Sequence, residues 1–584
     1  MGFMNYCKNP VYHSKTETTQ AWAGYPAILE ALSRKVTVCL EEKGSCLLAV
    51  DTYPGVDEAE LLEALSTLQS ALFLDMREAL CPKEEFAKRI APFLTDDRVF
   101  GRMYFGTLRD FQVEEKLEAL RRQAKEASGL VLVFGFGAGS LLEPDLLLYA
   151  DVSRWELQLR YRRGMTNYYT DNPKEDNLKK NKQGYFFEWR IGDKQKRQVF
   201  DRFDFYLDTN KKGEPAMAAG DCYRRALAEI TQRPFRTVPY FDPGVWGGQW
   251  MKKVCGLDPE EKNYAWSFDG VPEENSLYLE IGGVLLETPA MNLVLYRPVE
   301  LLGPQVYARF GAEFPIRFDF LDTMGGQNLS LQVHPLTDYI HNQFGMNYTQ
   351  DESYYILDAE EGAEVYLGLK EGICPREMIN DLKIAQTGEK PFDADRYINR
   401  FPAKKHDHFL IPAGTVHCSG SGCMVLEISA TPYIFTMKLW DWGRLGLDGR
   451  PRPIHIEHGE KVIQWDRQTR WVEENLVSPT YTIRETEDYK EEHTGLHELE
   501  FIETRRYEIK TACPLDTCNN VNMLNLVEGE AAVIESPVGA FEPFEIHYAE
   551  TFILPAAAGK YTIRPIEGQP VKVIRAYVRT PKGD

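Results

Sequence analysis

Hydrophobic residues in the first 230 positions alternate between short continuous runs and stretches of helical spacing. Ser45–Val50, Gly129–Phe136 and Leu146–Val152 are nearly all apolar, which is typical of parallel strands buried on both faces. Asp57–Leu72 instead repeats leucines at the spacing of an amphipathic helix. The alternation predicts an α/β domain with a parallel sheet over residues 1–230. Within it, residues 162–200 are rich in charged and amide side chains, and we expect a mobile lid or a solvated loop.

The pattern changes after about residue 235, where short strands separated by Gly, Pro and Asn turns dominate. Such a series is typical of a β-sandwich or barrel. It predicts one β domain over 235–470, interrupted by a helix at Pro375–Ile384, and a second β domain over 471–584. In the first of these the expected strands are 276–283, 293–301, 314–321, 329–335, 352–359 and 363–369.

Composition and charge narrow the class of protein. The chain has 584 residues, of which 43% are hydrophobic, and a formal net charge of −21. The hydrophobic content is sufficient for several globular cores. The negative net charge makes a nucleic acid or an anionic membrane an unexpected partner, because binding to phosphate groups requires a basic protein surface. The most apolar stretch, 129–152, is broken by Glu143, Pro144 and Asp145, so no membrane-spanning helix is predicted.

Cysteines and histidines are distributed unevenly. The eleven cysteines include no C-x-x-C pair, which suits a reducing cytoplasm and offers no thiolate zinc site. Of the eleven histidines only His13 precedes residue 330. Any imidazole chemistry is therefore expected in the second half of the chain.

Four residues in that half form a candidate metal-binding set. Gln332 and His334 are two residues apart in a predicted strand and so project from the same face. Glu352 lies at the start of another predicted strand, and His417 follows the turn residues of a third. Two imidazoles, one carboxylate and one amide oxygen suit Zn²⁺ or a similar divalent ion, one per chain. Periodicity alone leaves the alternative that Glu352 is a surface charge and His417 a core residue.

At this point the chain resembles the class I mannose-6-phosphate isomerases, which are cupin metalloenzymes, from about Pro239 to Val462. The resemblance implies a jelly-roll fold in which Gln332, His334, Glu352 and His417 bind zinc, and in which Glu427 and Arg444 line the sugar site. The motifs that carry it are PYFDPGVWGG (239–248), NYAWSFDG (263–270), LSLQVHP (329–335), DESYYILDAEEGAEVYLGLK (351–370), IPAGTVH (411–417), VLEIS (425–429) and DWGRLGLDGRPRPIHIE (441–457).

Two positions depart from the family pattern. Asp319 and Gln350 stand where family members usually carry lysines near the sugar phosphate. A phosphate site in this chain then requires other hydrogen-bond donors, and guanidinium and ammonium groups are the side chains best suited to bind phosphate. We assign substrate binding to Ser330, Arg317, Lys438 and Arg450, the last two within a basic segment that also holds Arg444, Arg452 and His455. An ion pair with Asp319 is the alternative role of Arg317.

The expected reaction is aldose–ketose isomerisation, with mannose 6-phosphate and fructose 6-phosphate as the sugar pair. Glu427, within an apolar run, is the expected proton shuttle, since burial raises the pKa of a carboxyl. Arg444 is expected to stabilise the enediolate. The alternative to the role of Glu427 is a salt bridge to the basic segment. Two alternative functions stay open: an isomerase or epimerase of a different sugar, phosphorylated or free, and a sugar-phosphate sensor or scaffold without turnover.

The two flanking domains are expected to lack their own chemistry. The order of elements in the N-terminal domain resembles P-loop nucleoside kinases of the uridine kinase type, but Asp57-Glu58-Ala59 replaces the G-K-[ST] residues that hold phosphate, so no ATP binding is predicted. The C-terminal block resembles a cupin at Ala549–Ala556, yet no histidine follows that turn and His547 has no second histidine near it. We predict a metal-free, structural domain there.

Overall fold

The computed structural model describes residues 5–15, 20–430, 433, 435–566 and 568–580. The chain divides into two compact units. The first, called the N-terminal unit below, comprises Val11–Ile230 and Ser276–Tyr296; the second, called the β unit, comprises Met1–Pro10, Thr231–Asn275 and Arg297–Asp584. Among the described residues, no helix is long and apolar enough to cross a bilayer.

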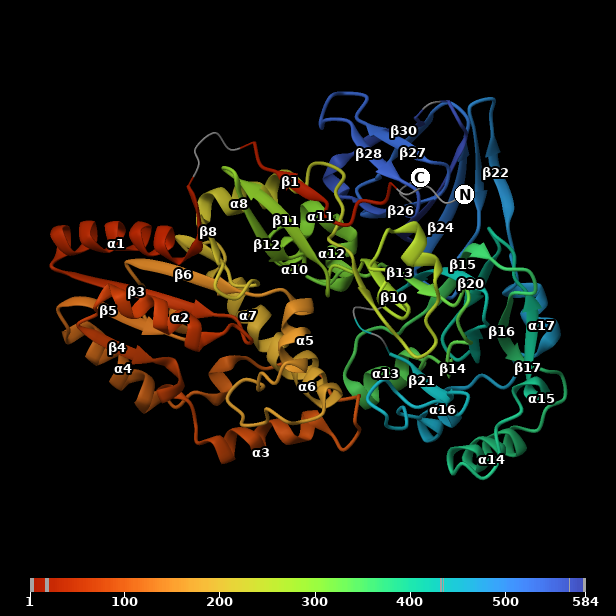
Figure 1. Ribbon diagram of the computed structural model, residues 1–584, viewed down its shortest axis with the longest axis horizontal. Helices are drawn as coiled ribbons and strands as arrows, with labels where there is room; N and C mark the ends of the chain where they lie inside the picture. Colours follow the sequence, from red (N-terminus) through yellow and green to blue (C-terminus); the bar gives the residue numbers. More distant parts are fainter. Residues whose placement is uncertain (1–4, 16–19, 431–432, 434, 567, 581–584) are drawn as a thin grey trace. The chain divides into compact units, whose positions relative to one another are not determined.

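The N-terminal unit is built on one seven-stranded sheet with the order β2-β8-β7-β6-β3-β5-β4 (Figure 1). The neighbours from β4 to β7 in this order run parallel, and β8 and β2 add antiparallel strands at one edge. The predicted parallel sheet is therefore confirmed. The strands are β2 (Ala21–Ala23), β3 (Ser45–Thr52), β4 (Leu72–Asp75), β5 (Gly129–Phe134), β6 (Leu146–Asp151), β7 (Phe205–Asp208) and β8 (Ala216–Ala219).

Eight α-helices of this unit lie along the chain between these strands or directly after them. The helix predicted at Asp57–Leu72 is shorter than expected, because β4 begins at Leu72. The helices are α1 (Gly24–Lys43), α2 (Glu58–Leu65), α3 (Lys83–Leu94), α4 (Glu114–Glu126), α5 (Arg154–Arg162), α6 (Asn177–Gln183), α7 (Trp189–Val199) and α8 (Gly220–Ile230).

The expectation of a lid or solvated loop over residues 162–200 is wrong for its second half. There α6, a π-helical turn (Gly184–Glu188) and α7 form a continuous helical segment, much of it buried. Lys196 on α7 is 2% exposed, and its ammonium group donates to both carboxylate oxygens of Asp151 at 2.8 and 2.9 Å. Asn292 accepts a third bond at 2.8 Å. Charge composition alone could not reveal that this lysine has a buried partner more than forty residues away.

One segment predicted as part of the 235–470 domain packs elsewhere. Ser276–Tyr296 belongs to the N-terminal unit, where β11 (Ser276–Ile281) and β12 (Val284–Pro289) form a three-stranded sheet with β1 (Val11–His13). The strand predicted at 293–301 is wrong, since α10 (Met291–Tyr296) and α11 (Pro298–Leu302) occupy it. Pro298 interrupts the apolar run and begins the second helix, a position that proline favours.

The central part of the β unit has two sheets, as the strand pattern predicted. One has the order β18-β15-β20-β13-β10-β9 and the other β17-β16-β19-β14-β21. Their strands are β9 (Tyr240–Asp242), β10 (Trp266–Gly270), β13 (Arg317–Asp322), β14 (Leu331–Val333), β15 (Glu352–Ala359), β16 (Glu364–Leu369), β17 (Ile398–Pro402), β18 (His408–Ile411), β19 (His417–Ser419), β20 (Cys423–Ser429) and β21 (Met437–Trp440).

Helices surround these sheets, and the predicted helical insertion is confirmed as α14 (Pro375–Gln386) (Figure 1). The others are α9 (Trp250–Val254), α12 (Pro304–Phe310), α13 (Thr337–Phe344), α15 (Ala394–Tyr397), α16 (Ile456–Val462) and α17 (Thr469–Asn475).

The C-terminal part of the β unit repeats the two-sheet arrangement. A six-stranded sheet, β22-β23-β24-β31-β26-β29, and a four-stranded sheet, β25-β30-β27-β28, share one apolar core. The strands are β22 (Tyr481–Glu485), β23 (Tyr489–His493), β24 (Ile502–Ile509), β25 (Cys513–Asp516), β26 (Asn522–Glu528), β27 (Ala531–Glu535), β28 (Phe544–His547), β29 (Thr551–Leu554), β30 (Lys560–Pro565) and β31 (Val571–Val578).

A buried ionic network joins the central and C-terminal parts. Arg236 is 6% exposed and pairs with Glu550 at 2.6 Å and with Asp269 at 3.3 Å. Asp269, on β10, also accepts from the backbone N–H of Thr551 on β29 at 2.8 Å. Glu550 lies in the turn at 549–556, which resembles the turn before the metal-binding histidine of a cupin. In this protein its carboxylate pairs with Arg236 and so connects one β domain to the other.

Candidate metal centre

Three side chains predicted as metal ligands meet between the two central sheets. His334 directly follows β14, Glu352 begins β15 and His417 begins β19. His334 Nε2 lies 3.1 Å from Glu352 Oε2, and His417 Nε2 lies 2.7 Å from Glu352 Oε1. All three side chains are fully buried. The alternative that Glu352 is a surface charge is therefore wrong.

Gln332 completes the set from the middle of β14. It pairs in register with His417 on β19, and its Nε2 atom lies 3.2 Å from His417 Nε2. An amide can present either its oxygen or its nitrogen at this position by turning about its last bond. The four residues chosen from the sequence thus converge on one point.

The surrounding backbone orients both imidazoles. Nδ1 of His334 lies 2.8 Å from the carbonyl oxygen of Phe435, and Nδ1 of His417 lies 2.9 Å from that of Thr415. With Nδ1 donating to a carbonyl, each ring presents Nε2 to Glu352. Histidines that bind metals are usually held in this way by a second hydrogen bond.

The donor set fits a divalent cation. The ligand atoms of His334, Glu352 and His417 all lie within 4.8 Å of one another. Glu352 Oε1 and His334 Nε2 are buried, and neither has a well-formed hydrogen bond among the described residues, so both are available as ligand atoms. Burial raises the pKa of Glu352, but the two imidazoles outweigh burial and hold that pKa well below its usual value. The group is thus a carboxylate with two nitrogen donors, which suits Zn²⁺.

Glu427 lies beside this centre on β20. It is 6% exposed, and its strand neighbours are Asp319 on β13 and Tyr354 on β15. Burial, with Asp319 and Glu352 close by, raises the pKa of Glu427 well above its usual value. A carboxyl group in that state can give a proton to a substrate and take one back.

Gln350 connects the metal centre to Glu427, a role that sequence analysis missed. Its Nε2 donates to Glu352 Oε2 at 3.0 Å and to Glu427 Oε1 at 3.3 Å, and its Oε1 accepts from the backbone of Phe435 at 2.7 Å. The sequence showed only that a family lysine is absent here. The contacts of a buried amide with two acids could not be read from that absence.

Arg317 and Asp319 form a buried ion pair on β13. Arg317 Nε donates to Asp319 Oδ1 at 3.1 Å, and the guanidinium lies 4.7 Å from the centre of the Phe268 ring. The alternative role given to Arg317 is therefore the one seen. Its Nη1 is buried without a hydrogen-bond partner among the described residues, so one donor stays available.

Several basic side chains gather around Asp441, next to the predicted ligand Gln332. Lys438 on β21 is paired in register with Gln332. Burial, and after it the charge of Arg452, lowers the pKa of Lys438 to about 7. Asp441 accepts from Ser330 at 2.7 Å, from Arg444 at 2.8 Å and from Arg452 at 3.0 Å. We call Ser330, Lys438, Arg444 and Arg452 the basic cluster.

Two residues of the basic segment behave differently from the expectation. Arg450 is exposed, on a turn in which its backbone N–H donates to Asp448. Arg452, which was not among the predicted substrate-binding residues, donates to the hydroxyl of Ser330 at 3.1 Å. The chain turns back just before Arg450, at Gly446 and Gly449.

The turn that presents His417 depends on a distant arginine. Nη1 of Arg467 donates to the carbonyls of Pro412 and Ala413, both at 2.7 Å, and to the hydroxyl of Thr415 at 2.5 Å. Nothing in the sequence pattern indicated this role, because the contact spans more than fifty residues.

Among the described residues, one other group has the geometry for a metal. It consists of Cys39, Cys46 and Asp145 in the N-terminal unit. There Lys43 pairs with Asp145, and the Cys39 thiol donates to the carbonyl of Ser45 at 3.6 Å. In the C-terminal part, His547 lies against Glu545 and Glu550, not against a second histidine.

Comparisons with known proteins find one matching family and several relatives. Residues 24–232 match a family described as "Domain of unknown function (DUF8485)". The mannose-6-phosphate isomerase ManA of Bacillus subtilis (strain 168) is 23% identical over 340 residues, which are 57% of this chain and 96% of the relative. The enzyme of the same name from Streptococcus mutans serotype c is 29% identical over 221 residues, 38% of this chain and 64% of the relative.

Solved structures give the same name. The mannose 6-phosphate isomerase from Bacillus subtilis superposes with a TM-score of 0.49 at 17% identity, covering 59% of this chain and all of that structure. A zinc-bound mannose 6-phosphate isomerase superposes with a TM-score of 0.46 at 14% identity over the same share. By sequence, 57% of this chain is similar to a protein named mannose-6-phosphate isomerase.

We predict one tightly bound divalent ion per chain. The double substitution His334→Ala/His417→Ala should remove it, because only Gln332 and Glu352 would then be left as donors. Elemental analysis of the purified protein measures the metal content. His547→Ala is the matched control and should keep the full content; retention of metal by the double variant would refute the assignment.

Proposed function

We propose that this protein is a metal-dependent isomerase that interconverts mannose 6-phosphate and fructose 6-phosphate through an enediol. The observation that carries the proposal is the buried His334–Glu352–His417 group beside Glu427, a carboxyl group whose pKa is raised well above its usual value by burial. A pure binding protein has no need of a buried acid with a raised pKa next to its metal. The relatives named mannose-6-phosphate isomerase support the choice of sugar.

We assign the metal to Gln332, His334, Glu352 and His417. Zn²⁺ or another divalent ion bound there would hold substrate oxygens and polarise the sugar carbonyl. Glu427 moves the proton between C1 and C2, and Gln350 fixes the distance between this acid and Glu352. Removing such an acid–base group typically costs about 10²–10⁴-fold in rate.

Arg444 is proposed to stabilise the negative charge of the enediolate. Its guanidinium is held by the carboxylate of Asp441 and by the carbonyl of Asn328 at 2.7 Å. A donor that is already oriented needs no reorganisation as charge develops in the substrate. The same two contacts would also be made by an arginine that only fastens the loop, so kinetics must decide the role.

The basic cluster is proposed to hold the sugar phosphate. Arg444 and Arg452 both donate to the single carboxylate of Asp441, and Lys438 lies within reach of their charges, so a phosphate group would add negative charge where basic groups outnumber acids. Lys438 stands opposite Gln332 and so adjoins the metal ligands. The cluster would replace the family lysines that are absent at Asp319 and Gln350. Arg317 is proposed to contribute through its one remaining donor.

The buried Arg317–Asp319 pair favours one alternative. It keeps a negative charge where relatives are expected to place a positive one, and this would suit an unphosphorylated sugar. A sensor or scaffold without turnover is the further alternative, and the environment of Glu427 argues against it.

The N-terminal unit is proposed to be a kinase-like remnant that does not bind ATP, and the protein is proposed to act in the cytoplasm. The backbone N–H groups of Gly137 and Gly139 could bind an anion, but both donate to the carboxylate of Asp51, at 2.8 and 3.0 Å. Asp57 caps α2 and Glu58 begins it, so the start of that helix already carries two acids. A polyphosphate would meet negative charge at both places.

We expect Glu427→Gln to lower kcat for mannose 6-phosphate by about 10²–10⁴-fold, because the amide cannot carry the proton. Metal content should not change. A coupled isomerase assay and elemental analysis measure the two quantities. Glu361→Gln, on the exposed turn after β15, is the matched control and should behave as wild type.

Two outcomes of the same assay would redirect the proposal. Faster turnover of free mannose than of its 6-phosphate would favour the unphosphorylated-sugar alternative. Binding without turnover of either sugar by fully metallated protein would favour the sensor.

Lys438→Met should raise KM for mannose 6-phosphate at least about tenfold with a smaller effect on kcat, because it removes a charge that contacts phosphate before and during reaction. The exposed residue Arg450 supplies the control, since Arg450→Met should leave KM unchanged. Equal effects of the two substitutions would place the phosphate outside the basic cluster.

We expect no binding of ATP with Mg²⁺ by the full-length protein in calorimetric titration up to millimolar concentration. The physical reason is the set of carboxylates at Asp51, Asp57 and Glu58. Micromolar affinity for ATP would contradict the assignment of this unit as a remnant.

A further inference from the structure

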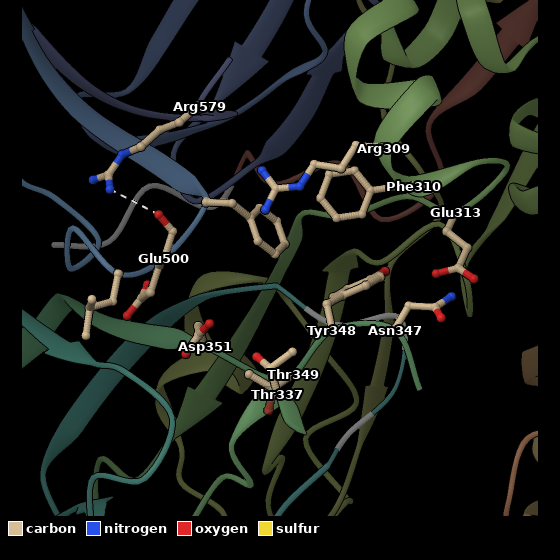
Figure 2. Close-up of a pocket in the computed structure, with 12 residues that line it drawn as sticks. Arg309, Phe310, Glu313, Thr337, Asn347, Tyr348, Thr349, Asp351, Glu500 and Arg579 are labelled. Carbon is tan, nitrogen blue, oxygen red and sulfur yellow. Dashed lines mark hydrogen bonds between the residues drawn. The ribbon is translucent and has the colours of Figure 1, made fainter. Parts of the chain in front are cut away.

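The β unit contains a cavity of about 530 Å³ that the proposed reaction does not use (Figure 2). It is lined by α12, by the segment before β15, by residues before β24 and by Arg579. Asp351 lines it, whereas its neighbours Gln350 and Glu352 belong to the metal centre. None of the four candidate metal ligands is among the lining residues, so the cavity is a place distinct from them.

Glu500 is the unusual member of the lining. It is 3% exposed, and neither of its carboxylate oxygens has a hydrogen-bond partner among the described residues. Figure 2 shows its side chain directed toward the side of Asp351. Burial, with Asp351 close by, raises the pKa of Glu500 well above its usual value. A buried carboxyl group without a partner destabilises a fold, and such groups are found where a ligand supplies the missing bond.

Three aromatic rings, those of Phe310, Tyr348 and Phe501, also line the cavity. The ring centres of Phe310 and Phe501 lie 4.8 Å apart, and that of Tyr348 lies 5.3 and 5.8 Å from them. The guanidinium of Arg309 lies over both phenyl rings, at 5.0 and 4.8 Å from their centres. Arg309 is itself exposed, so its donors face solvent at the rim.

Further polar side chains complete the lining. Thr337, Asn347 and Thr349 contribute hydroxyl and amide groups, and Glu313 contributes a third carboxyl group. Aromatic faces combined with carboxyl, amide and hydroxyl groups match a sugar ring, whose C–H face is apolar and whose hydroxyls both donate and accept. The volume lies within the range usual for small-molecule sites.

We propose that this cavity binds a hexose, free or phosphorylated, at a site separate from the metal centre. The ring packs against Phe310 and Phe501, and sugar hydroxyls donate to Glu500 and Asp351. Arg309 at the rim binds the phosphate of a phosphorylated ligand. The proposal rests on the lining of the cavity alone and does not require the proposed isomerase activity.

The test uses the full-length His334→Ala/His417→Ala variant, which removes the metal centre as a second binding place. Calorimetric titration with D-mannose and with D-mannose 6-phosphate should show one hexose per chain. If the double variant does not fold, wild-type protein treated with a chelator replaces it. Failure of both sugars to bind would overturn the proposal without bearing on isomerase activity, which is measured separately on metallated wild type.

Substitutions in the lining locate the bound sugar. Glu500→Met and Phe310→Ala should each weaken binding at least tenfold, whereas Glu498→Gln, two residues away and exposed, should not change it. Arg309→Met separates the two ligands: it should weaken binding of the 6-phosphate and spare free mannose if the phosphate contacts the rim. Unchanged affinity in both Glu500→Met and Phe310→Ala would overturn the site.

Thermal stability distinguishes a ligand-binding role of Glu500 from a structural one. The carboxyl group of Glu500 has no hydrogen-bond partner among the described residues. The Glu500→Met variant should therefore have the same melting temperature as wild type or a higher one. A melting temperature lowered by several degrees would show that Glu500 supports the fold, and would overturn its role in binding.

Discussion

The burial of the Glu352 carboxylate between two imidazoles is the constraint on which the central β domain depends. A fully buried charge is tolerated only when other groups compensate it, and here both compensating rings come from the other sheet. The two sheets must therefore close at this point, and Gln332, His334 and His417 must all be in register. Carbonyl groups of Phe435 and Thr415 then fix the rings. The fold and the metal centre are thus one electrostatic arrangement.

Acid groups next to that centre have pKa values shifted in opposite directions because their surroundings differ. The two imidazoles hold the pKa of Glu352 well below its usual value, while burial raises the pKa of Glu427 well above it. Asp319 is intermediate: burial raises its pKa to about 6, although Arg317 opposes the effect. Gln350 bonds to both Glu352 and Glu427, and an amide can do so without adding charge. A lysine at this position would instead add a positive charge beside both acids and so favour their ionised forms.

Compensation of buried charges also occurs in the flanking parts of the chain, where buried ion pairs connect separate elements. In the N-terminal unit Lys196 forms a buried ion pair with Asp151. Asp51 accepts hydrogen bonds from the backbone N–H groups of Gly137 and Gly139, so these groups are not free to bind an anion. In the C-terminal part Glu550, at a turn of the metal-binding type, pairs with Arg236. Buried ion pairs of this kind add little net stability, but removing one partner typically costs about 3–5 kcal/mol. Polar residues in these parts serve to position strands.

The sequence by itself determined the strands of the parallel sheet, most strands of the central β domain and the four candidate ligands. These follow from local rules: apolar runs mark buried strands, and residues two apart in a strand share a face. It was wrong where the pattern is ambiguous. The apolar run at 293–301 forms helices broken at Pro298, because a short apolar run suits either structure. Only the tertiary structure decided that Arg452 bonds to Ser330 and Asp441, that Gln350 bonds two acids, and that Glu500 lines a cavity with no hydrogen-bond partner for its carboxylate among the described residues. These arrangements depend on burial and on residues that the fold brings together from separate strands, which no local pattern records.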